Sequence, residues 1–211
     1  LDHPRSMFRL PNGDILVAET NSPPRTNKGI EGWIMRNLMS KAGAGTESAN
    51  RISLLRDSDK DGTVDEKFTF LENLNSPFGM ELIDDTLYVA NTDAVYAYPY
   101  TEGDTKISAE GRKVANLNAR APNNHWTRDL LASKDGKYLY ISVGSNSNIG
   151  ENGMDIEKQR AAILQVELAT NKKAIYADGM RNPVGMAYLP GTEKFYTVVN
   201  ERDMLGSDMV P

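Results

Sequence analysis

The sequence predicts an all-β protein, a β-propeller of four-stranded antiparallel blades, of which this chain carries about three and a half. Four segments that start near residues 3, 76, 125 and 181 resemble one another, and each joins two apolar strands through a tight turn. Two more strand-like runs follow each of the first three segments. A hairpin followed by two strands, repeated at roughly 50-residue spacing, is typical of propeller blades. We therefore expect residues 1–211 to form one partial propeller.

Turn residues mark the middle of each repeated segment. They are Asn12-Gly13, Asp84-Asp85, Asp135-Gly136 and Pro190-Gly191. Asn-Gly and Asp-Gly are strong hairpin signals, because these residues accept the positive φ angles of a two-residue turn. Each segment is therefore expected to be a hairpin formed by the first two strands of a blade.

The outer strands of the blades follow as short runs rich in Val, Ile, Leu and Tyr. These runs cover residues 50–57, 66–74, 94–100, 112–117, 161–168 and 173–180. Within the third hairpin, polar and apolar residues alternate from Tyr138 to Val143, as is typical of a strand. The first repeat is lengthened by an insertion at 21–49. Four apolar residues there predict a short amphipathic helix that ends near Gly43: Trp33, Ile34, Leu38 and Met39.

The composition excludes several classes of protein and of site. A formal net charge of −5 and a pI of about 5.2 leave no basic footprint for a nucleic acid. No apolar run reaches the roughly 18 residues that a membrane-spanning helix needs. The absence of cysteine excludes disulfides and thiolate metal sites. No signal-peptide pattern follows Leu1, and a start without methionine is what we expect of a processed or trimmed chain.

An aspartate-rich loop between two outer strands has the spacing of a calcium-binding loop. Asp57, Asp59 and Asp61 take loop positions 1, 3 and 5, and Asp65 takes position 9, with a glycine at position 6. Position 12, where an EF-hand has its bidentate glutamate, is Phe68. Two interpretations stay open. The loop is either a weak structural calcium site or an Asx-rich turn held by bonds from side chains to the backbone.

One of the two histidines, His125, leads into the first strand of the third repeat, where a proline stands in the other three repeats. The turns that lead into the inner strands of a propeller converge on its axis, so His125 should face the central funnel. A neutral imidazole, with an ordinary pKa near 6.5, can act there as a general base. Next to Arg128 and Asp129, it could equally be a hydrogen-bonded loop residue, and His3 also precedes an inner strand.

Two further polar groups are expected at the same lip of the funnel. Arg181 and Asn182 precede the inner strand of the fourth repeat, and a planar guanidinium beside an amide suits a flat, oxygen-rich ligand. The alternative is a turn at Asn182 beside a solvated arginine. The loop after the last strand carries Glu201, Asp203 and Asp208, whose oxygens can hold Ca²⁺ or simply form an acidic surface.

Five stretches of the chain, kept in order, point to one family. They are HPRSMFRLPNGDILVAETN, NRISLLRDSDKDG, HWTRDLLASKDGKYLYISVGS, GMRNPVGMAY and NERDMLGSDMVP. Over nearly the whole chain these stretches resemble the soluble pyrroloquinoline-quinone (PQQ) dependent sugar dehydrogenases, in particular the L-sorbosone dehydrogenase-like branch. The resemblance implies a six-bladed propeller with PQQ at the funnel mouth and Ca²⁺ beside it. It also implies oxidation of an aldose or sugar aldehyde, an electron acceptor as partner, and a periplasmic or secreted location.

The resemblance assigns roles to three residues of the funnel. His125, ten residues before Asp135, matches the general base. The base would take the proton of the sugar C1 hydroxyl, or of the hydrated aldehyde, while hydride passes to the quinone. Arg181 and Asn182 match the pair that binds the quinone and its carbonyls.

The calcium site implied by the resemblance falls in the last loop. Its Glu, Gly and Asp pattern places the two metal-binding backbone carbonyls at Asp203 and Met204. This chain departs from relatives that often have Gly-Pro there. It also has Asn124 where some relatives carry an acidic residue beside the base. Under this reading the Asp57–Asp65 loop is structural.

Two other functions remain open from the sequence. One is a non-catalytic propeller that binds protein or glycan, because propellers host many functions. The other is a calcium-dependent propeller lactonase, which needs carboxylate and Asn ligands at the axis and no quinone. The later blades of the family, with further basic cofactor contacts, do not occur in the 211 residues, so we expect this portion alone to be inactive.

Overall fold

The computed structural model describes residues 1–23 and 48–203. The helix predicted within the insertion at 21–49 falls on residues 24–47, outside the described ranges, and so do Met204 and Asp208. Within the described ranges, no helix is long and apolar enough to cross a bilayer.

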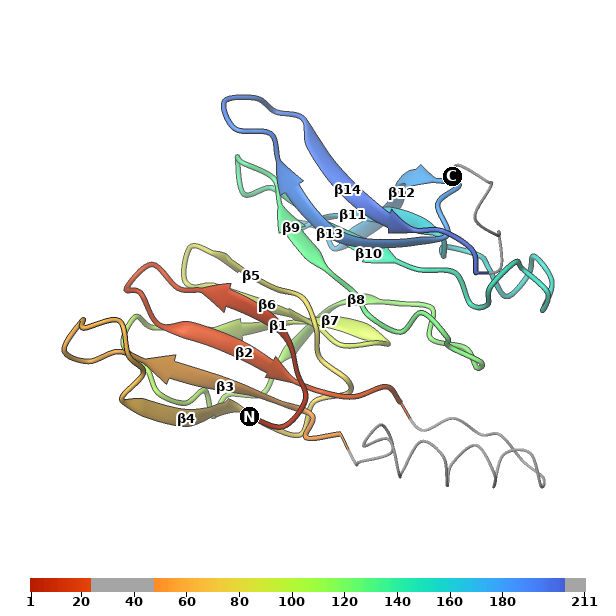
Figure 1. The fold of residues 1–211 in the computed structure, drawn as a ribbon. Helices are drawn as coiled ribbons and strands as arrows, with labels where there is room; N and C mark the ends of the chain where they lie inside the picture. Colours follow the sequence, from red (N-terminus) through yellow and green to blue (C-terminus); the bar gives the residue numbers. More distant parts are fainter. Residues whose placement is uncertain (24–47, 204–211) are drawn as a thin grey trace, which may run out of the picture.

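Three four-stranded antiparallel sheets and one hairpin make up the described chain (Figure 1). The first sheet consists of β1 (Pro4–Arg9), β2 (Ile15–Glu19), β3 (Arg51–Arg56) and β4 (Glu66–Leu71). The second consists of β5 (Met80–Ile83), β6 (Thr86–Ala90), β7 (Ala94–Pro99) and β8 (Arg112–Asn116). The third consists of β9 (Leu130–Ala132), β10 (Tyr138–Val143), β11 (Ala162–Glu167) and β12 (Lys172–Asp178). The hairpin consists of β13 (Asn182–Tyr188) and β14 (Phe195–Asn200).

The first strands of the four units lie next to one another. β1 contacts β5, β5 contacts β9, and β9 contacts β13. Each sheet then continues away from this row in chain order, as the blades of a propeller do. The structure therefore confirms the predicted all-β fold, a β-propeller of four-stranded antiparallel blades of which three and a half are present.

Apolar side chains fill the spaces between successive sheets. The cluster between the first and second sheets includes Leu16, Leu54, Phe70, Leu87 and Val89. The cluster between the second and third includes Ala90, Val95, Leu139, Ile141 and Leu164. Aromatic rings join the third sheet to the hairpin, with centroids 4.8 to 5.4 Å apart: Tyr140, Tyr176 and Phe195. Because a sheet follows on each side, β10 is buried on both faces from Leu139 to Val143, although its sequence alternates.

The two ends of the blades carry different kinds of loop. The four predicted turns join β1 to β2, β5 to β6, β9 to β10, and β13 to β14, and their glycines include Gly13, with a φ of 100°. These turns lie at one end of the blades, on the left in Figure 1, together with the loop between β3 and β4. The segments that lead into β9 and β13 lie at the opposite end, where the predicted funnel residues are found.

Candidate functional site

Residues from three separate segments meet at the loop end of the third and fourth blades. His125 leads into β9, Gly144 and Ser145 follow β10, and Arg181 precedes β13. The Ser145 N–H donates to the Arg181 carbonyl at 2.7 Å, and the Ser145 carbonyl lies 2.9 Å from His125 Nδ1. The structure thus brings the predicted base and the predicted arginine to one place, although 56 residues separate them in the chain.

The surroundings of His125 fix its tautomer. Its Nδ1 lies 2.9 Å from the Ser145 carbonyl and 3.0 Å from Ser145 Oγ. A carbonyl can only accept, and Ser145 Oγ donates its own proton to the Ser147 carbonyl at 2.7 Å. Nδ1 must therefore carry the proton in the neutral ring, which leaves the lone pair on Nε2, the nitrogen that a general base uses.

Charge and burial favour the neutral form of this imidazole. Burial lowers the pKa of His125 below its ordinary value, and the positive charges of Arg181 and Arg160 lower the pKa further. The Ser145 carbonyl and the Asp203 carboxylate act in the opposite direction. The net direction leaves His125 uncharged, with a free acceptor, near neutral pH.

Gly144 allows the side chains of Asn182 and His125 to approach each other. A Cβ at this glycine would lie 2.2 Å from Asn182 Oδ1 and 2.5 Å from His125 Cβ. Asn182 is buried, and its Oδ1 has no hydrogen-bond partner among residues 1–23 and 48–203. The Asn182 amide therefore lies against the Gly144 backbone next to His125, and its Oδ1 can still accept a hydrogen bond.

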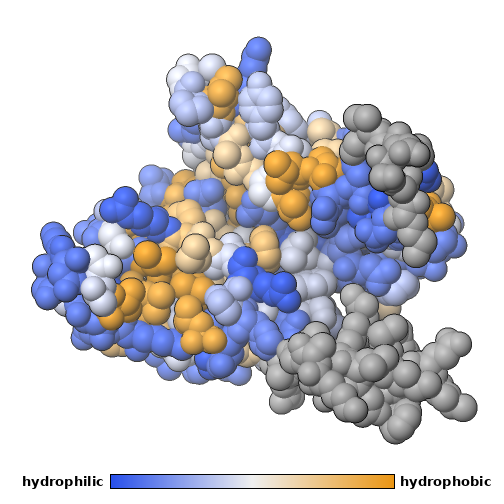
Figure 2. Space-filling model, viewed as in Figure 1, coloured by the Kyte–Doolittle hydropathy of each residue, from blue (hydrophilic) through white to orange (hydrophobic). Residues whose placement is uncertain are grey.

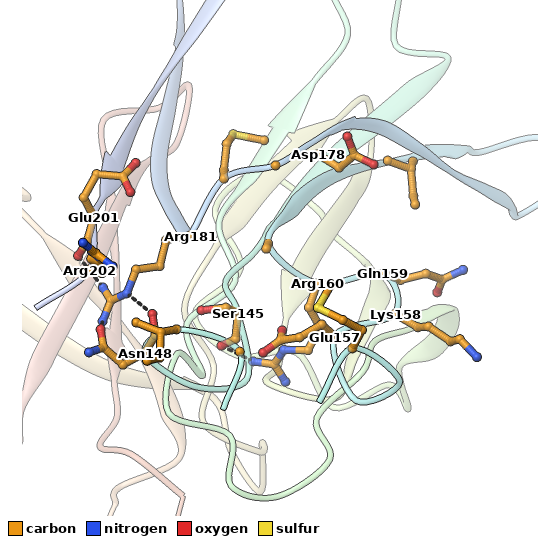
Figure 3. A pocket seen from close by; sticks show the side chains of 17 residues that line it. Ser145, Asn148, Glu157, Lys158, Gln159, Arg160, Asp178, Arg181, Glu201 and Arg202 are labelled. Atoms are coloured by element: carbon orange, nitrogen blue, oxygen red, sulfur yellow. Dashed lines mark hydrogen bonds between the residues drawn. The ribbon is translucent and has the colours of Figure 1, made fainter. Parts of the chain in front are cut away.

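Arg181 uses all five of its N–H groups within the protein. Nε donates to the Asn148 carbonyl, and Nη1 donates to the carbonyls of Asn200 and Glu201. Nη2 donates to Asn148 Oδ1 at 2.6 Å and to Asp203 Oδ2 at 3.1 Å. Figure 3 shows Arg181 reaching across to Asn148. The arginine thus ties the loop after β10 to the residues after β14.

Asp203, one of the two residues predicted to bind calcium through its carbonyl, lies beside the predicted arginine. Its carboxylate pairs with Arg181, and its backbone N–H donates to Asn148 Oδ1 at 3.0 Å. The start of the predicted calcium loop, at Glu201 and Asp203, therefore lies beside the arginine. Met204, the other predicted carbonyl ligand, lies outside the described residues.

A cavity of about 810 Å³ opens next to this cluster. The loop after β10 and the turn between β12 and β13 form its walls. Figure 3 shows its polar side chains, which include Ser145, Asn148, Glu157, Arg160 and Arg181. Four basic residues, counting Lys158 and Arg202, line this space together with three acidic ones, Glu157, Asp178 and Glu201, so its charges are mixed, with a slight excess of positive charge.

The aspartate-rich loop is remote from these residues. It joins β3 to β4 at the turn end of the blades (Figure 1). Carboxylate oxygens of Asp57, Asp59 and Asp61 lie within 4.8 Å of one another, as they would around a cation. Asp57 also accepts the N–H of Gly62 at 2.9 Å, and Asp65 accepts that of Ser58 at 2.7 Å. Both interpretations of the loop remain, and neither places it in the funnel.

Three residues of the site were not predicted from the sequence. Ser145 and Asn148 lie in a polar run after β10 whose only signal is its composition. Arg160 is 3% exposed and donates to four backbone carbonyls, but in the sequence it is indistinguishable from a surface charge. A buried arginine is recognised only once its long-range partners are placed.

Fold and site together define a β-propeller whose loop end brings a histidine, an arginine and an asparagine to one place. Residues 38–210 match the family model described as TrAA12-like. The match covers most of the sequence, so the chain belongs to the TrAA12-like family.

Several solved structures share this fold. The calcium structure of a Trichoderma reesei protein of carbohydrate-active enzyme family AA12 is 21% identical, with a TM-score of 0.70, over 97% of this chain and 47% of that chain. The holo PQQ domain of pyranose dehydrogenase from Coprinopsis cinerea is 15% identical, with a TM-score of 0.64, over 89% and 41%. A periplasmic gluconolactonase from Pseudomonas aeruginosa is 11% identical, with a TM-score of 0.52, over 98% and 59%.

One curated relative also matches. An uncharacterized protein of Borreliella burgdorferi is 27% identical over 152 residues, which are 68% of this chain and 39% of the relative. The chain therefore spans about two fifths of the length of that relative and less than half of the first two solved structures.

Proposed function

We propose that the protein contributes blades to a PQQ- and calcium-dependent dehydrogenase that oxidises an aldose or a sorbosone-like sugar aldehyde. Membership of the TrAA12-like family and the fold shared with a PQQ domain support this function. One observation carries it. His125 is held with Nδ1 protonated and Nε2 free, beside an arginine that precedes the next inner strand. This is the arrangement that proton abstraction from a sugar hydroxyl requires.

The residues present fit a flat quinone that bears carboxylates. Bound PQQ would supply the oxidant, which takes hydride from the sugar carbon. Arg181 and the basic side chains of the cavity supply positive charge, and Asn182 keeps an unpartnered oxygen beside Gly144. Because all five N–H groups of Arg181 are already used, direct bonding to a quinone oxygen requires the release of one partner. Asp203, whose side chain is 74% exposed, is the partner most easily released.

The chain's own part in the reaction is then proton transfer and orientation. His125 Nε2 would take the proton from the C1 hydroxyl, while Ser145 holds the opposite nitrogen and so fixes the plane of the ring. Arg181 would stabilise negative charge on the cofactor oxygens. The backbone carbonyls of Asp203 and Met204 would hold Ca²⁺, which prefers oxygen ligands. The Asp57–Asp65 loop would remain structural, with or without its own calcium.

The partners and location that go with this function are also proposals. They are a small sugar substrate, a separate electron acceptor, and a periplasmic or secreted setting. Completing the ring would add the remaining blades of a six-bladed propeller and further cofactor contacts. The 211-residue portion on its own is expected to be inactive.

The test uses a polypeptide that contains this chain within a complete ring of blades. We expect reduction of an electron-accepting dye by aldoses or sugar aldehydes only when PQQ and Ca²⁺ are both added. A chelator should abolish the activity, and Ca²⁺ should restore it. Dye reduction that proceeds without PQQ, or none at all in a folded protein loaded with both, would exclude the proposed function.

A calcium-dependent propeller lactonase is the second candidate. The shared fold with a gluconolactonase favours it, and so do buried side-chain oxygens without partners, at Asn91 and Asp93 in the second blade. Such oxygens are the ligands that Ca²⁺ prefers. Hydrolysis of gluconolactone with Ca²⁺ and without PQQ would favour this candidate. Absence of both activities would leave a propeller that only binds a ligand.

A further inference from the structure

Two arginines are buried directly behind the candidate base. Arg128 is 0% exposed and Arg160 is 3% exposed. Within the described residues, no carboxylate is hydrogen bonded to either guanidinium. Burying a charge without a bonded counter-ion destabilises the folded protein. The burial of two such arginines therefore calls for a structural or functional explanation.

Their hydrogen bonds are directed almost entirely to the backbone. Of eight bonds, seven end on main-chain carbonyls and one on Asn123 Oδ1. Both arginines donate to the carbonyl of His125, at 2.6 Å from Arg128 and 3.1 Å from Arg160. Both also donate to the carbonyl of Asn118, at 3.2 and 2.8 Å. The segment that carries the imidazole is therefore clamped by two rigid guanidinium groups.

Arg160 also reaches the carbonyl that orients the imidazole. Its Nη2 donates to the Ser145 carbonyl at 2.9 Å, and His125 Nδ1 lies at 2.9 Å from the same oxygen (Figure 3 shows the Arg160–Ser145 bond). Its Nε donates to the neighbouring Gly144 carbonyl at 2.9 Å. The Arg160 guanidinium and His125 Nδ1 are thus bonded to the same Ser145 carbonyl oxygen. The positive charge of Arg160 is therefore held close to the imidazole, and the two donors compete for one acceptor.

We propose that Arg160 is a positioning residue, whose charge, fixed on the Ser145 carbonyl, keeps His125 in the neutral form with Nε2 free to accept a proton. The role rests on the proposed function of His125 as the base. Arg128 supports it by fixing the His125 backbone. Around the imidazole, Arg181 adds a second positive charge and Asp203 opposes both. Burial lowers the pKa of Arg160 to about 10, so the guanidinium keeps its charge at neutral pH.

The direct test is a proton titration of His125 by NMR in the protein without cofactor. Only one other histidine, His3, is present, so the two signals can be assigned by a His3→Gln variant. We expect the His125 midpoint in the wild-type protein to lie below that of histidine in an unstructured peptide. A midpoint at or above the peptide value would overturn the proposal, whatever the variants do.

Three variants separate charge from packing. Arg160→Gln removes the charge, so the His125 midpoint should rise. Arg160→Lys keeps the charge but loses the planar fork, so the midpoint should stay near the wild-type value. Lys158→Gln removes an exposed charge two residues away, which pairs with Asp155 at the surface, and should leave the His125 midpoint of the cofactor-free protein unchanged. Equal midpoints in the Gln and Lys variants would show that Arg160 acts through packing alone and would refute the proposal.

Activity gives an independent readout. In a PQQ-loaded, complete propeller, the acidic limb of the pH–rate profile should move upward in Arg160→Gln by the same amount as the NMR midpoint. Absence of any PQQ-dependent activity would refute the proposed function. It would not affect the NMR titration, which is measured without cofactor. An NMR shift without a matching shift of the rate profile would mean that His125 is not the base.

Discussion

Single residues at the candidate site are constrained by close contacts between loops. Gly144 is the clearest case, because its neighbours would lie 2.2 and 2.5 Å from an added Cβ, at Asn182 Oδ1 and His125 Cβ. These distances are far below ordinary contact. Asn182 Oδ1 ends a short, buried side chain, and His125 Cβ is attached directly to its backbone, so neither atom can easily move aside. The glycine is thus required by the close approach of two loops, and its φ needs no special explanation.

Gly144→Ala should therefore displace His125 and destabilise the fold by about 1 to 3 kcal/mol, as overpacking of a buried site does. Urea unfolding and the NMR signal of His125 measure the two effects. Gly153→Ala is the matched control, because nothing lies within 4 Å of its Cβ position and only its φ of 87° opposes a side chain. The control should lose about 1 kcal/mol and leave His125 unmoved. A Gly144→Ala variant with wild-type stability and an unshifted His125 signal would contradict the reported geometry.

At the scale of elements, inner strands of neighbouring blades are joined by carboxylates. Glu81 of β5 accepts the N–H of Ala132 in β9 at 3.2 Å, and Asp129, just before β9, accepts that of Met186 in β13 at 3.0 Å. Burial raises the pKa of both acids, that of Glu81 to about 7. The repulsion between the two carboxylates adds to the shift of Glu81. The hydrogen bonds of Glu81 and Asp129 align the inner strands, but they require two carboxylates to be partly buried, which disfavours the charged form of each.

This shift makes the stability of the protein depend on pH. The folded pKa of Glu81 lies above the unfolded value, so the folded state binds the proton more tightly. The contribution of Glu81 to stability is therefore full below about pH 4 and is lost as pH rises through 7, by an amount on the order of 2 kcal/mol. Glu81→Gln keeps an acceptor for Ala132 and removes the charge.

The variant should be more stable than the wild-type protein at pH 8 and nearly equal to it at pH 5. Urea unfolding at the two pH values measures the difference. A wild-type protein whose stability does not fall between these values, relative to the variant, would show that Glu81 is solvated rather than buried.

The same scale explains what the sequence could and could not predict. Turns and strands depend on neighbouring residues, so the four hairpins and the outer strands were predicted correctly, and the positions of His125 and Arg181 followed from the repeats. The contacts of Ser145 and Arg160 join segments 15 to 42 residues apart and end on backbone carbonyls. Every residue has a backbone carbonyl, so the pattern of side chains in the sequence does not show which distant carbonyls will accept these bonds. Burial of both faces of β10 likewise depends on the neighbouring sheets.

At the scale of the whole molecule, the two outermost faces of the row of blades are exposed. Figure 2 shows an apolar area over the first sheet, where Met7 of β1 is 75% exposed and the partly exposed Ile15 and Leu55 are paired across β2 and β3. At the other end of the row, Tyr196 and Val198 of β14 are 62% and 65% exposed. Inner blades bury the equivalent faces against a neighbour. Both faces are therefore suited to further blades, in keeping with the greater length of the solved relatives.

In the proposed function, a histidine from the third blade acts on a substrate held at a cofactor bound beside the fourth blade. The most direct measurement is the rate at which bound PQQ is reduced by an aldose in a single turnover, in the complete propeller with Ca²⁺. We predict that His125→Ala binds PQQ as tightly as the wild-type protein but reduces it at least about 100-fold more slowly. Equal rates of reduction, or loss of PQQ binding together with the rate, would contradict the role of His125 as the base.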